Sequence, residues 1–134
     1  MGYGWKFLIE RNGKLTSNYD GSEWTVGEWR EVPEPARACA GLNCSRTIPD
    51  AHGFVAGDVL ARVEYAGTRI DTGDKFTCQR MRVIKAWRVP DYEAKCAPLY
   101  ADYEAKCALL YADYAKALTK ALTSGRPDFA KGRE

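Results

Sequence analysis

The sequence predicts an α+β protein, in which a small antiparallel β-sheet domain is followed by one long C-terminal helix. Two apolar stretches alternate with a period of two, and an Asn12-Gly13 pair is typical of a tight hairpin. An 11-residue unit is written three times near the C-terminus, which favours a helix. The expected organisation is a β-rich domain over residues 1–90, a helix over 91–123 and a flexible tail over 124–134.

The first third of the domain reads as short strands. Trp5–Glu10 and Lys14–Tyr19 are expected to pair across the Asn12-Gly13 turn. Glu23–Val32 is a further candidate strand, and the prolines that follow it end any sheet pairing.

The second part of the domain carries the clearest strands. Ala36–Leu42 is expected to form a short helix, and Ile48–Gly57 a loop with at most one helical turn. Val59–Tyr65 alternates between apolar and charged residues, as a half-buried antiparallel strand does. Phe76–Trp87 is a second such strand, whose apolar phase slips between Cys78 and Met81 and indicates a bulge.

The repeat consists of Asp91–Ala101, Asp102–Ala112 and a diverged copy, Asp113–Thr123. The first two copies differ at one position, which is Pro98 in the first copy and Leu109 in the second. This near-identity indicates a duplication, so the repeat is expected to tolerate changes of length. As one helix it would be about 45–50 Å long, with a kink at the proline. One narrow stripe would then hold Tyr92, Cys96, Leu99, Tyr103, Cys107, Leu110, Tyr114 and Leu118.

Composition excludes several classes of protein. The net charge of +2 is too small for a protein that coats nucleic acid. There is no apolar run long enough for a membrane span and no secretory signal at Met1. The five cysteines therefore read as reduced thiols of a cytoplasmic protein.

No catalytic set, metal site or cofactor is predicted. Cys39, Cys44, His52 and Cys78 could be assembled into a zinc site, but no second cysteine pair completes it, which favours buried free thiols. A cysteine nucleophile with His52 as its base is the alternative, although no signature surrounds any cysteine.

Two sets of residues are candidates for binding a partner. The tyrosines of the repeat could pack on the first domain, on a second copy of the chain or on another protein. A basic cluster in the strand before the repeat could touch phosphate, although such a cluster is more often a solvated strand face. The eight candidate residues are Tyr100, Tyr103, Tyr111, Tyr114, Arg80, Arg82, Lys85 and Arg88.

Several short motifs resemble a known family. They are Ala38–Ser45, Asp50-Ala51, Ala56–Glu64, Gly67, Asp74-Lys75 and Arg80–Ile84. Together they are similar to an uncharacterised family of small bacterial and phage proteins, some of which continue into helical repeats rich in tyrosine and alanine. This chain has Asn43 where the family pattern has histidine. The resemblance implies a phage or prophage accessory protein that acts on host machinery.

The leading hypothesis is therefore a phage accessory protein that binds a host protein, as an inhibitor of a host defence system such as CRISPR–Cas would. One alternative is a small enzyme acting on nucleotides or nucleic acid, with a pocket near Cys39–His52, which His52, Arg46 and Asp50 lining one cleft would favour. Another is a structural protein that self-associates, forming a homodimer through its C-terminal helix. The expected partner is a host protein in the host cytoplasm, and neither nucleic acid nor a membrane is expected.

Overall fold

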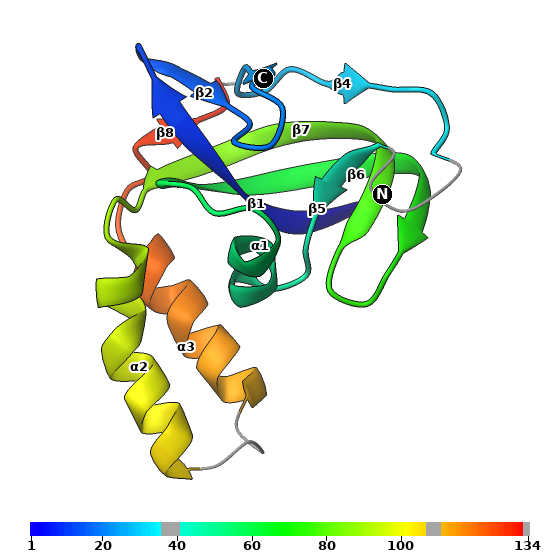
Figure 1. Cartoon of the computed structure of the whole chain (residues 1–134). Helices are drawn as coiled ribbons and strands as arrows, with labels where there is room; N and C mark the ends of the chain where they lie inside the picture. Colours follow the sequence, from blue (N-terminus) through cyan, green and yellow to red (C-terminus); the bar gives the residue numbers. More distant parts are fainter. Residues whose placement is uncertain (36–40, 107–110, 133–134) are drawn as a thin grey trace.

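A computed structural model of the protein describes residues 1–35, 41–106 and 111–132. Over these ranges eight strands form one antiparallel sheet, and three short helices accompany it. Figure 1 shows the helices on one side of the sheet and β2, β4 and β8 on the other.

The N-terminal hairpin forms where the sequence predicts it. β1 (Gly2–Arg11) pairs with β2 (Lys14–Thr16), and β3 (Glu23–Trp24) pairs with β2 in turn. Asn12 and Gly13 both have positive φ, at 53° and 78°. These are the backbone angles that a tight two-residue hairpin requires, and asparagine and glycine adopt them at little cost.

The longest strands lie at the centre of the sheet. β6 (Val59–Asp71) pairs with β7 (Phe76–Arg88) on one edge and with β1 on the other. The register of β6 against β7 shifts between Ala66 and Arg69, opposite Gln79. The irregularity therefore lies where the apolar phase slips, but the extra residue is in β6.

The sheet closes on itself at one end. β4 (Arg30–Glu31), β5 (Leu42–Cys44) and β8 (Phe129–Ala130) pair with successive stretches of β7. Ser45, directly after β5, exchanges two backbone hydrogen bonds of 2.8 Å with Trp5 of β1. The strands β1, β6, β7 and β5 thus form a closed circuit, which we call the strand ring.

Each face of the ring has its own apolar core. The inner core contains Leu8, Val63, Met81 and Val83, all with no exposed surface, and the segments β2–β4 cover it with Leu15, Trp24 and Val32. The outer core joins the sheet to the helices and contains Trp5, Phe7, Leu60, Trp87, Val89, Ile48, Ala51, Cys96, Leu118 and Leu122.

Helix α1 (Ile48–Phe54) occupies the segment expected to be mostly loop. Thr47 is its N-cap, and the Oγ1 atom of Thr47 accepts a 3.2 Å hydrogen bond from the Asp50 amide. Pro49 fits the first turn because its missing N–H is not needed there. Burial of Ile48 and Ala51 against the sheet stabilises a helix that its glycine would otherwise weaken.

The prediction of one long C-terminal helix is wrong. The repeat forms two helices, α2 (Tyr92–Lys106) and α3 (Tyr111–Thr123), which pack antiparallel as a hairpin (Figure 1). The physical reason is the apolar stripe: in a single helix its distal half would have nothing to pack on. In the hairpin, Leu118 and Leu122 are buried against the sheet. The stripe residues Cys107 and Leu110 lie outside the described residues.

Three further expectations change. Phe129 and Ala130, in the expected flexible tail, form β8, and the Arg88 amide donates a 3.1 Å hydrogen bond to the Asp128 carboxylate. The candidate strand Glu23–Val32 is split into β3 and β4. Within the predicted helix Ala36–Leu42, residue Leu42 begins β5, and residues 36–40 lie outside the described part of the chain.

Candidate functional site

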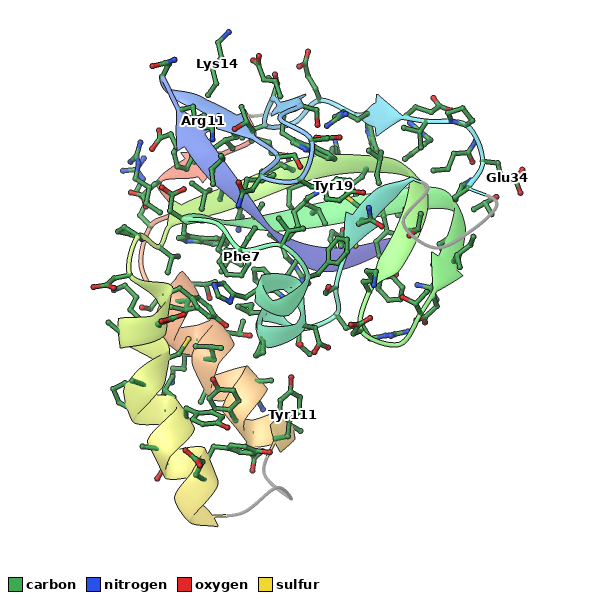
Figure 2. All side chains as sticks on the ribbon, viewed as in Figure 1. Phe7, Arg11, Lys14, Tyr19, Glu34 and Tyr111 are labelled. Carbon is green, nitrogen blue, oxygen red and sulfur yellow. The ribbon has the colours of Figure 1, made fainter. Side chains whose placement is uncertain are left out.

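The four candidate tyrosines form one group, which we call the tyrosine cluster: Tyr100 and Tyr103 of α2, and Tyr111 and Tyr114 of α3. Their ring centroids lie 5.3 to 6.2 Å apart in five pairs. Tyr100 is 49% exposed and Tyr111 38%, while the other two are half-buried. Figure 2 shows Tyr111 at the end of α3 that lies away from the sheet.

The cluster has a buried base. Tyr92 and Tyr114 both hydrogen-bond to the Sγ atom of Cys96, and burial raises the pKa of both phenols. The Tyr92 ring stacks on His52 of α1, with ring centroids 3.9 Å apart. These contacts fix the position of the hairpin relative to α1, so the exposed tyrosines are displayed on a defined support.

The basic candidates do not join the tyrosine cluster. Arg80 and Arg82 lie over the Trp29 ring, at 4.7 and 4.8 Å from its centroid, and the Nε atom of Arg82 donates a 2.7 Å hydrogen bond to the buried Glu64 carboxylate. Arg88 makes two hydrogen bonds to the carboxylate of Glu10, which lower the pKa of that carboxyl. Lys85 is exposed beside a shallow depression near Trp87.

A pocket opens at the closed end of the strand ring, and residues 41–45 and Ala51, inside the segment Cys39–His52 where a pocket was expected, form part of its lining. We call it the Lys6 pocket, with a volume of about 280 Å³. It is enclosed by the strands β1, β4 and β5, by the helix α1 and by the segment that joins β2 to β3. Its polar lining includes Lys6, Ser17, Tyr19, Asp20, Ser22, Arg30, Asn43 and Ser45, and its apolar lining includes Trp5, Phe7, Trp24, Val32, Leu42, Phe54 and Val55.

Lys6 is the unusual group of this pocket. Its side chain points to the same side of β1 as Leu8, and its Nζ atom lies 4.4 Å from the centroid of the Trp24 ring. Burial, together with a smaller effect of the nearby Arg30 guanidinium, lowers the pKa of Lys6 from 10.5 to about 8. No carboxylate of the described residues forms an ion pair with Lys6.

Two buried donors in the pocket lining are also without a partner. The Nε1 atom of Trp24 and the Oγ atom of Ser45 have no hydrogen-bond partner among the described residues, although both residues are at least 97% buried. Asp20 is occupied by its own turn, because the amide and hydroxyl of Ser22 donate to it at 3.0 and 2.6 Å and lower its pKa. Trp24 and Ser45 therefore add two unpartnered donors to the residues around the pocket.

The cysteine and histidine candidates are only partly brought together. The thiols of Cys44 and Cys78 hydrogen-bond to each other inside the ring, and that bond and burial raise the pKa of Cys44. His52 packs instead between Phe7 and Tyr92, and burial lowers its pKa. Cys39 lies outside the described residues, within which no group of three potential metal ligands occurs.

The candidate enzyme pocket near His52 does not assemble from the residues considered for it. Arg46 pairs with Asp71, and the Asp50 amide donates to the Oγ1 atom of Thr47, the N-cap of α1. Neither residue, nor His52, lines the Lys6 pocket. Sequence reasoning missed Lys6 itself, although a signal existed: in Trp5–Glu10 the lysine shares a face with Leu8.

The buried lysine gives a pH-dependent stability. The folded state holds the pKa of Lys6 near 8, below the unfolded value of 10.5. Below pH 8 the protonated Lys6 therefore lowers the stability of the folded protein. This penalty is relieved as the pH rises from 8 to 10.5, by up to about 3 kcal/mol. We expect Lys6→Met to be more stable than the wild-type protein at pH 7 in urea unfolding. The difference should shrink by pH 10.5; a difference that stayed constant would contradict a buried charge at Lys6.

Comparison with protein-family models, curated proteins and solved structures gives no significant match. Among the described helices, none has both the length and the apolar character needed to cross a membrane.

Proposed function

We propose that this chain is a non-enzymatic phage or prophage accessory protein that binds a host protein through the tyrosine cluster, and that its binding inhibits a host defence system. The observation that carries the proposal is the contact of four tyrosines across α2 and α3, with Tyr111 at the end of α3 that lies away from the sheet. The resemblance of residues 38–84 to small phage proteins supports the class of protein and its place in the host cytoplasm.

Tyrosine suits such a surface for two physical reasons. Its ring buries a large apolar area with little loss of conformational entropy, and its hydroxyl can remain hydrogen-bonded at the edge of an interface. Tyrosines that already pack against one another lose little further freedom on binding. Tyr103 and Tyr114 each contact the three other rings of the cluster, and Tyr114 also packs on the outer core, so Tyr103 is the central ring expected to contribute most to binding.

Photo-crosslinking in the host identifies the partner. A benzophenone amino acid is placed at position 111, in the cluster, and at position 19 as a control, because Tyr19 is 70% exposed on a different part of the molecule. A host protein crosslinked from position 111 but not from position 19 is the expected result. Identical crosslinks from both positions would contradict the proposal, and a crosslink to a second copy of the chain would replace it with self-association.

The purified partner then allows an affinity measurement. We expect Tyr103→Ala to weaken binding by about 10- to 100-fold, as the loss of a central aromatic anchor does. Tyr19→Ala is the matched control and should bind like the wild-type protein. Circular dichroism of both variants checks that the hairpin is intact, and an unchanged affinity of folded Tyr103→Ala would refute binding through this cluster.

A further inference from the structure

We propose that the Lys6 pocket binds a small organic anion, in which a carboxylate or phosphate group contacts Lys6 and Arg30 and a flat apolar body fills the rest of the pocket. This site is separate from the tyrosine cluster and does not depend on the proposed function. The argument rests on the charges, the unpartnered donors and the shape of the pocket.

The charges of the pocket favour an anion. The Nζ atom of Lys6 and the Cζ atom of Arg30 each lie 4.4 Å from the centroid of the Trp24 ring, so they are at most twice that distance apart. A carboxylate or phosphate group that enters the pocket beside this ring would be attracted to both cations. Arg30 donates a 3.0 Å hydrogen bond to the Ser22 hydroxyl and forms no ion pair with a described residue, so its charge remains available.

The Asp20 carboxylate attracts both cations but forms an ion pair with neither of them. Asp20 lines the same pocket, but it accepts the two hydrogen bonds from Ser22 and makes no ion pair with Lys6 or Arg30. A half-buried ammonium packed against an indole ring without an ion-paired carboxylate loses hydration that an anion can replace. An anionic ligand would supply that compensation at the position where the protein does not.

The unpartnered donors and the apolar walls define the rest of the ligand. The Trp24 indole N–H and the Ser45 hydroxyl belong to residues of the pocket lining and have no hydrogen-bond partner among the described residues, which places two further donors beside the pocket. Val32, Leu42 and Phe54 offer apolar surface beside them. A volume of about 280 Å³ is at the lower end for ligand pockets, which suits a single ring with one anionic group.

Three probes of similar size test the ligand class by isothermal titration calorimetry. Benzoate carries a carboxylate, phenyl phosphate carries a phosphate, and benzamide is the neutral counterpart of benzoate. We expect one or both anions to bind at millimolar concentration or below and benzamide to bind at least tenfold more weakly. Binding of one anion alone identifies its head group. If benzamide bound as well as the anions, or if neither anion bound, the proposal would be overturned.

Variants locate the binding to the pocket. Lys6→Met and Arg30→Met should each weaken anion binding by about 10- to 100-fold. Lys14→Met is the matched control, because Lys14 is an exposed lysine at the tip of the β1–β2 hairpin (Figure 2). In a ¹⁵N-labelled sample the Trp24 indole N–H resonance, assigned by its loss in Trp24→Phe, should shift on titration. An unmoved Trp24 resonance, or unchanged affinity in both pocket variants, would show that the anion binds elsewhere.

The pH dependence gives an independent readout. Anion affinity should fall as the pH rises above 8 in the wild-type protein, because the Lys6 amine loses its charge there. The other titratable or charged groups near Lys6 are Tyr19, Asp20, Arg30, Cys44 and Cys78. Lys6→Met keeps all of them, so a fall that persisted in this variant would exclude Lys6 as the anion's partner.

Discussion

Deletion of residues 102–112, one complete repeat unit, is expected to lower the free energy of unfolding by more than about 4 kcal/mol and to release α3 from the sheet. Leu118 and Leu122 of α3 are 0% and 7% exposed in the outer core, and losing either buried side chain costs about 2–5 kcal/mol. The deletion joins Ala101 directly to Asp113, so the chain can no longer reverse between α2 and α3. Urea unfolding followed by circular dichroism measures the loss.

Two point variants show how stability responds when residues of the repeat change but its length does not. Pro98→Leu makes the first repeat copy identical to the second without changing its length, and Pro98 is exposed inside α2, so no loss of stability is expected. Leu118→Ala keeps the hairpin but removes its most buried contact, at a cost of about 2–5 kcal/mol. A deletion variant as stable as the wild-type protein would show that the repeat is the adjustable appendage that its duplication suggested.

Arg82→Met is expected to destabilise the protein by about 3–5 kcal/mol. The substitution removes the guanidinium that donates a hydrogen bond to the Glu64 carboxylate, and Glu64 is only 6% exposed. The double variant Arg82→Met/Glu64→Gln removes the buried negative charge as well and should recover most of this loss. Thermal and urea unfolding of the single and double variants measure the difference.

Arg80→Met is the matched control for this pair. Arg80 lies over the same Trp29 ring as Arg82, but its Nε atom has no hydrogen-bond partner among the described residues. Its replacement should cost no more than about 1 kcal/mol. Equal losses from Arg80→Met and Arg82→Met would mean that the contact with Trp29 matters and the bond to Glu64 does not. The expected result marks Arg82 as a structural residue within the basic set considered for partner binding.

The strands near the N-terminus and at the centre of the sheet could be predicted because their signals are local. The positive φ angles at Asn12 and Gly13 are a property of those two residues, and the alternation over Val59–Tyr65 repeats every second residue. The phase slip near Gln79 also had a local signature, although its partner strand took the extra residue. By contrast, α1 forms because Ile48 and Ala51 are buried against the sheet, and the local sequence does not reveal that contact.

The candidate sites divide in the same way. The tyrosines were noticed because they recur at fixed spacing, but their contact across α2 and α3 depends on a chain reversal that identical repeat units do not signal. The Lys6 pocket has no motif at all. It combines a lysine of β1, an arginine of β4 and a tryptophan of β3, which become neighbours only after the sheet has curled.

The sequence by itself therefore determined that the long strands β1, β6 and β7 are extended, where the first hairpin turns and that the C-terminal repeat is helical. These properties depend on backbone preferences and side-chain spacing within a few residues. Only the tertiary structure decided that the repeat folds back as a hairpin, that Ser45 closes the strand ring against Trp5 and that Lys6 is buried beside Trp24. Each of these depends on which apolar surfaces, distant in the sequence, can cover one another, and that is a property of the whole chain.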